Sequence, residues 1–236
     1  AAGQAIRDAT HLVVTAPPGE QGDPVLAAHA EAIAAAPALR WIGYLSTTGV
    51  YGDRGGAVVT EADAPSPGQP RSIRRLAAEA AWRAAAAARG AALDLFRTGG
   101  IYGPGRSALD ELRAGTARRV IRPGHAFSRI HRDDIALAVV AAALRHAPAE
   151  TRVLHLVDDE AAPSADVIAE AARLLGVPPP PETAFETARA GMSAMALSFW
   201  SERRVVSNAI TRASLGLRWR HPTYREGLRA ILASGG

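Results

Sequence analysis

The chain has 236 residues, of which 48% are hydrophobic and 21% charged, a composition typical of a packed globular domain. It contains no cysteine, which excludes a disulfide framework, a thiolate metal site and a cysteine nucleophile. All 27 basic residues are arginine, none is lysine, and the net charge is +4. These arginines form short clusters without interleaved aromatic side chains, so we expect no nucleic-acid partner.

The chain carries no sign of a membrane or secretory destination. No apolar run approaches the roughly 20 residues that a membrane helix needs. The first residues also lack the charged and then apolar pattern of a secretion signal. We therefore expect a cytoplasmic protein without a membrane partner.

In chain order, short apolar runs alternate with longer helical patterns, which predicts an α/β fold with a parallel sheet. We expect strands at 11–16, 41–46, 93–97 and 153–157. We expect helices at 24–36, 71–89, 107–114, 133–146 and 164–175. Gly90 and Gly176 should end two of these helices, and Asp133 and Ser164 should cap the starts of two. Residues 178–201 show little periodicity.

Three segments carry motifs, and they occur in a fixed order. Residues 45–53 read Leu-Ser-Thr-Thr-Gly-Val-Tyr-Gly-Asp, after an apolar run that should deliver hydroxyl groups to the carboxyl edge of the sheet. Residues 93–105 read Leu-Asp-Leu-Phe-Arg-Thr-Gly-Gly-Ile-Tyr-Gly-Pro-Gly, and residues 130–136 read Ile-His-Arg-Asp-Asp-Ile-Ala. Over most of residues 10–232 the chain resembles the extended short-chain dehydrogenases/reductases, the NAD-dependent epimerase/dehydratase family, in an atypical form.

The resemblance implies a Rossmann-like, doubly wound parallel sheet with a small C-terminal lobe. Residues 1–150 should form a partial NAD(P)-binding domain, with 103–130 contributing to the lobe, and 151–236 the last strand and the substrate lobe. No Gly-x-Gly-x-x-Gly follows any strand, so we expect the first strands of the family fold to be absent from this chain. NAD or NADP should then bind only if that N-terminal glycine-rich loop is present.

The resemblance also assigns the catalytic positions. Thr47 takes the place of the family's catalytic Ser/Thr, while Arg71 and Arg75 take the places of its Tyr and Lys. A guanidinium stays protonated at neutral pH, so Arg71 cannot replace the tyrosine as a proton donor. Arg75 is expected to hold the cofactor ribose, although both arginines are equally well explained as solvated helix residues.

The remaining site residues follow from the same resemblance. The residues placed against the cofactor are Thr15, Ala16, Pro17, Leu45, Ser46, Arg75, Thr98, Gly99, Gly100 and Ile101. Thr48 and Arg129 are expected to contact substrate. In nucleotide-sugar epimerases an arginine that binds the substrate diphosphate precedes the motif histidine by four residues; here Phe127 stands there. We interpret His131, Asp133 and Asp134 as structural and expect no metal.

Two functions remain open at this point. The first is an NAD(P)-binding oxidoreductase or epimerase that acts on a small or sugar-like substrate without the Tyr/Lys pair. The second is a non-catalytic NAD(P)-binding redox sensor or scaffold. The absence of lysine favours the second, and the retention of Thr47 and the Gly99-Gly100 pair favours the first. In both cases we expect a monomer or homodimer with a small-molecule partner.

Overall fold

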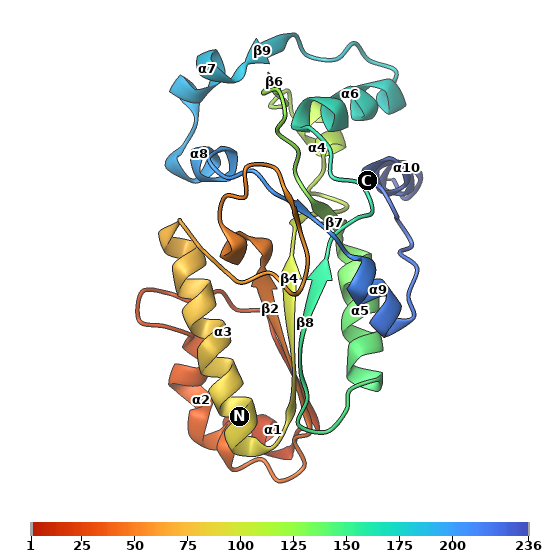
Figure 1. Cartoon of the computed structure of the whole chain (residues 1–236). Helices are drawn as coiled ribbons and strands as arrows, with labels where there is room; N and C mark the ends of the chain where they lie inside the picture. The colour runs from red at the N-terminus through yellow and green to blue at the C-terminus, as the bar shows by residue number, and fades with distance from the viewer. Residues whose placement is uncertain (1, 236) are drawn as a thin grey trace.

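Four parallel strands form the central sheet of the computed structural model, which describes residues 2–235 (Figure 1). In their order across the sheet these are β1 (His11–Val14), β2 (Trp41–Thr47), β4 (Ala92–Thr98) and β8 (Thr151–Leu156). The register pairs Thr47 with Thr98, and Thr98 with Leu156, so three strands end at one edge. The predicted single parallel sheet of a Rossmann-like α/β fold is confirmed.

Helices cover both faces of this sheet (Figure 1). On one face lie α1 (Ala2–Asp8), α2 (Pro24–Ala34) and α3 (Pro70–Arg89), and on the other α5 (Arg132–Leu144) and α9 (Ala209–Leu215). Successive strand residues point to opposite faces, so Tyr44 packs with Trp82 in one core cluster. Trp41 packs with Phe96 and Leu215 in the other.

The ends of the helices match the sequence in part. Gly90 and Gly176 end α3 and α6 (Ser164–Leu175) at φ values of 71° and 68°, the left-handed conformation that glycine adopts without strain. The two predicted N-caps are wrong. His131 caps α5, with Asp133 already in the first turn, and Pro163 occupies the cap position of α6 without a side-chain hydrogen bond.

A smaller lobe lies beyond the carboxyl edge of the sheet (Figure 1). It contains α4 (Ala108–Arg113), β6 (Arg119–Ile121), α6, β9 (Glu182–Ala184), α7 (Phe185–Ala188), the 3-10 turn η2 (Arg189–Gly191), α8 (Ala194–Trp200) and α10 (Tyr224–Ala233). β6 and β9 pair in parallel, while α9 lies outside this lobe and packs against β8 and α5. None of the helices within residues 2–235 has the length and apolarity to cross a bilayer.

Two short strand pairs connect the sheet edge to the lobe. β5 (Gly100–Tyr102) pairs with β7 (Arg129–His131), directly after β4. β3 (Val58–Val59) pairs with β10 (Val205–Val206). This pair joins the long loop that follows the 3-10 turn η1 (Thr48–Tyr51) to the segment that follows α8. In the same region the carbonyl of Arg203 accepts the amides of Arg54 and Gly56 at 2.9 and 3.0 Å.

A buried ion pair lies where α3 crosses the ends of β2 and β4. Arg97 of β4 donates to the Glu79 carboxylate of α3 through Nε and a terminal nitrogen, at 3.1 and 2.7 Å, and the two side chains are 3% and 1% exposed. Ser46 of β2 donates to the same carboxylate at 2.5 Å. Three elements therefore meet at one carboxylate.

Arg97→Met should lower the free energy of unfolding by about 3 kcal/mol, because it leaves the Glu79 carboxylate buried without its cation. Urea denaturation measures this change. The control is Arg173→Met, which removes an arginine paired with Glu170 on the surface of α6 and should change stability very little. Equal, small losses in the two variants would contradict a structural role for the buried pair.

Candidate functional site

A cavity of about 490 Å³ opens at the carboxyl ends of β2 and β4. It is bounded by the start of α3, residues 126–129 and residues 199–206. The predicted site residues that line it are Ser46, Thr47, Thr48, Arg71, Arg75, Thr98, Gly99, Gly100, Ile101 and Arg129. The lining does not include Thr15, Ala16, Pro17 or Leu45. The structure thus brings most of the predicted residues together.

Thr47 is the last residue of β2 and lines the cavity. Its Oγ1 accepts the amide of Gly49 at 3.1 Å and thereby caps η1. A hydroxyl that accepts one bond still has a proton to donate, and no acceptor for it lies within residues 2–235. Thr47 therefore lines the cavity with a donor that a ligand oxygen can use.

Hydrogen bonds made by Ser46 and Thr98 inside the protein hold the ends of β2 and β4 in place. The Ser46 hydroxyl donates to Glu79, and Thr98 Oγ1 donates to the carbonyl of Ser46 at 2.9 Å. Both residues are buried, so their hydroxyls are engaged inside the protein. Their effect on the site is to position the adjacent Thr47.

The two arginines of α3 differ in their surroundings. Arg75 donates from one terminal nitrogen to the Tyr44 hydroxyl at 3.0 Å and to the carbonyl of Leu45 at 2.9 Å. Its other guanidinium donors remain for a ligand. Arg71 lies 3.9 Å above the ring of Phe199, and burial lowers the pKa of its guanidinium, which still stays protonated at neutral pH.

Gly99 and Arg129 lie where β5 and β7 approach each other. A Cβ on Gly99 would come within 2.6 Å of the Ser128 carbonyl oxygen, so close strand packing alone requires a glycine here. Arg129 donates to the carbonyls of Phe127 and Ala162 at 3.0 and 2.8 Å, and burial lowers its pKa. Arg129 thus holds the loop that bounds the cavity.

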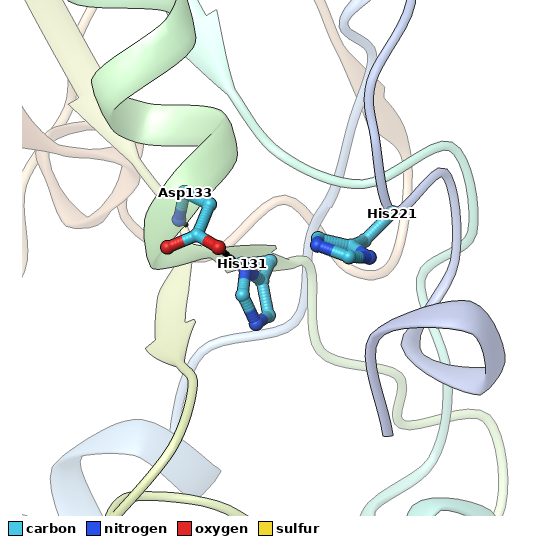
Figure 2. Close-up of side chains that lie close together, drawn as sticks. All are labelled: His131, Asp133 and His221. Atoms are coloured by element: carbon cyan, nitrogen blue, oxygen red, sulfur yellow. Dashed lines mark hydrogen bonds and ion pairs between the residues drawn. The ribbon is translucent and has the colours of Figure 1, made fainter. Parts of the chain in front are cut away.

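His131 and two neighbours form a cluster of possible metal-ligand atoms (Figure 2). Ligand atoms of His131, Asp133 and His221 lie within 4.8 Å of one another. However, His131 Nδ1 accepts the amide of Asp133 at 3.2 Å, and burial lowers the pKa of the imidazole. The Asp134 carboxylate accepts the amides of Arg220 and His221 at 2.7 and 3.0 Å. These contacts give His131 and Asp134 helix-capping and loop-holding roles.

Several cavity residues were not predicted from the sequence. They are Gly49, Arg106, Ala126, Phe127, Ser128, Ser164, Phe199, Trp200, Glu202, Arg204 and Val206. Those from 199 onward come from or follow the stretch without periodicity, so no local pattern indicated them. A second cavity of about 480 Å³ borders the first and shares Gly100, Ile101, Arg106, Arg129 and Ser164 with it.

Behind Arg129 lies a buried acid that holds its proton. Asp158 accepts from the Tyr102 hydroxyl at 3.0 Å, while its other oxygen is buried without a hydrogen-bond partner among the described residues. Burial raises the pKa of Asp158 to about 8.

Asp158→Asn should flatten the dependence of stability on pH. An unfolded aspartate loses its proton near pH 4, whereas the folded one keeps it to about pH 8. The folded state binds more protons between these values, so the free energy of unfolding should fall as pH rises through this window. Denaturation at several pH values measures this slope. Asp166→Asn, at an exposed position of α6, is the control; a slope unchanged by Asp158→Asn would contradict the assignment.

The comparisons with known proteins agree with the fold. No family model matches the chain. A functionally unknown conserved protein from Silicibacter pomeroyi DSS has a solved structure with 44% identity and a TM-score of 0.86, over 96% of this chain and 78% of that one. The solved structure of MoeE5 with UDP-glucuronic acid and NAD is 21% identical, with a TM-score of 0.74 over 98% and 80% of the two chains.

One curated relative also matches. A 3-diazoavenalumate denitrifying reductase from Streptomyces sp is 34% identical over 179 residues, which is 70% of this chain. The chain spans 55% of that relative's length. The parallel sheet, the three ordered motifs around its carboxyl edge and these similarities agree with one another: the chain has the fold of the extended short-chain dehydrogenases/reductases, the NAD-dependent epimerase/dehydratase family.

Proposed function

We propose that the chain forms the nicotinamide and substrate side of an NAD(P)-dependent oxidoreductase or epimerase that works without a Tyr/Lys pair. One observation carries this proposal: Thr47, Arg71, Arg75 and the Gly99-Gly100 segment line a single cavity at the carboxyl edge of the sheet. The NAD bound in MoeE5 and the reductase name of the Streptomyces relative support it. We also propose a cytoplasmic protein that is a monomer or homodimer; light scattering on the purified protein would measure the oligomeric state, and cell fractionation the location.

The lining suits an anionic dinucleotide. Five arginines and one carboxylate, Glu202, are the ionisable residues among those described around the cavity. Thr98, Gly99 and Gly100 would lie against the nicotinamide ring, and at Gly100 the absence of a side chain would permit a close approach. Arg75 would hold the ribose hydroxyls with its free donors. When bound, the cofactor supplies hydride chemistry at this edge.

The protein groups would then act on one substrate oxygen. The Thr47 hydroxyl would donate a hydrogen bond to it, and Arg71 would place a fixed positive charge nearby without transferring a proton. A redox sensor that binds NAD(P) without turnover is the second candidate. It is favoured by the guanidinium of Arg71 at the position of the family's proton donor.

Thr47→Val should reduce turnover by about 100-fold while cofactor affinity changes little, because a donor to the reacting oxygen acts most strongly in the transition state. Thr47→Ser keeps the hydroxyl and the cap on Gly49, so it is the matched control and should retain most activity. The measurements are steady-state turnover and hydride exchange with the full-length protein. NAD(P) binding with no turnover on any carbonyl or sugar substrate would instead support the sensor.

Arg75→Met should weaken NAD(P) binding by about ten-fold, because it removes charged donors to the ribose. Calorimetry with NAD and NADP measures the change. Arg83→Met, on the same helix but outside the cavity, is the control. Unchanged NAD(P) affinity in Arg75→Met would mean that Arg75 does not bind the cofactor and serves only its hydrogen bonds with Tyr44 and Leu45.

A further inference from the structure

Three aromatic side chains, Phe127, Phe199 and Trp200, line the cavity, and we refer to them as the aromatic wall. The rings of Phe127 and Trp200 meet edge to face, with centroids 5.0 Å apart. Phe185 packs on Trp200 at 5.3 Å, and His125 packs on both Phe127 and Trp200 at 4.6 and 5.1 Å. Burial lowers the pKa of His125 to about 4, so this support is uncharged at neutral pH. These contacts hold Phe127 and Trp200 in place, while Phe199 is 49% exposed and lies against Arg71.

Beside this wall lies an arginine that has no protein partner. Arg71 stacks on Phe199, and its guanidinium makes no hydrogen bond or ion pair within residues 2–235. Two other lining arginines are engaged, since Arg204 pairs with Glu202 at 2.7 Å and Arg129 donates to two backbone carbonyls. Arg106 also makes no side-chain hydrogen bond or ion pair within residues 2–235, but unlike Arg71 it is exposed. A half-buried, unpaired guanidinium favours an anion that can accept two parallel hydrogen bonds.

The wall and the free guanidinium favour one kind of anion. A carboxylate on a flat π-system offers a face for stacking on aromatic rings and two oxygens for Arg71. A nucleoside diphosphate would need charged donors along the wall as well as at Arg71, and the rings of the wall supply none. A cavity of about 490 Å³ is within the range of small-molecule sites.

We propose that this cavity binds a planar aromatic or conjugated carboxylate, stacked on the aromatic wall with its carboxylate on Arg71. This molecule would be the substrate of the proposed oxidoreductase. Only its role as substrate rests on the proposed function. Binding itself depends on residues of the wall and on Arg71.

Isothermal calorimetry with trans-cinnamate tests this proposal, on the full-length protein with and without NAD. Cinnamate should bind, whereas cinnamyl alcohol, which lacks the charge, and cyclohexanecarboxylate, which lacks the flat π-system, should bind at least about ten-fold more weakly. Arg71→Met should weaken cinnamate binding by about ten-fold or more, and Arg71→Lys by less. Phe127→Leu should weaken cinnamate binding several-fold, because it removes one aromatic stacking contact.

Arg83→Met is the control and should leave cinnamate affinity unchanged. Failure of cinnamate to bind, equal affinity in Arg71→Met, or tighter binding of UDP-glucose than of cinnamate would each overturn the proposal. NAD binding is measured separately. If NAD binds and cinnamate does not, the substrate class is wrong and the proposed function stands. If cinnamate binds but NAD and NADP do not, the proposed function fails and the assignment of the cavity stands.

Discussion

The Glu79–Arg97 ion pair is the interaction on which the geometry of the site depends. Burying two charges is costly unless their hydrogen bonds are satisfied, and here Ser46 completes the set. Arg97 also lies 4.8 Å from the ring of Tyr51, whose hydroxyl bonds His155 of β8 at 2.5 Å. A polar chain therefore crosses the ends of β2, β4 and β8 beneath the cavity. The position of Thr47 follows from this chain, because its neighbour Ser46 is part of it.

Much of the fold could be predicted because its signals are local. Three of the four sheet strands are largely apolar runs of six or seven residues, and the long helix α3 ends at a glycine, which adopts the required conformation without strain. The parallel arrangement then places the ends of β2 and β4 together. For this reason Thr47, Thr98 and the Gly99-Gly100 pair could be assigned to one edge of the sheet before their contacts were known.

The rest of the site depends on contacts between distant segments. β9, α7 and α8 are too short to produce a readable period, so the position of Phe199 and Trp200 beside α3 has no local signal. The predicted starts of two helices were wrong for a similar reason. The sequence favours Asp133 as a cap, but the helix begins earlier, and the His131 ring accepts the amide of Asp133 itself. Thr15, Ala16 and Pro17 lie outside the lining of this cavity, so their expected contact with the cofactor stays a prediction.

The pairing of β3 with β10 has a mechanical consequence for recognition. Residues 205–206 follow Trp200 by only a few positions, while residues 58–59 follow the turn that Thr47 caps. Arg204 adds a bond from the same segment to the carbonyl of Gly52 at 3.0 Å. The aromatic side of the cavity is thus fastened by backbone contacts to the loop that continues from the threonine. The distance between the two sides is therefore fixed by backbone pairing before any molecule binds, and a ligand that spans both would have to match it.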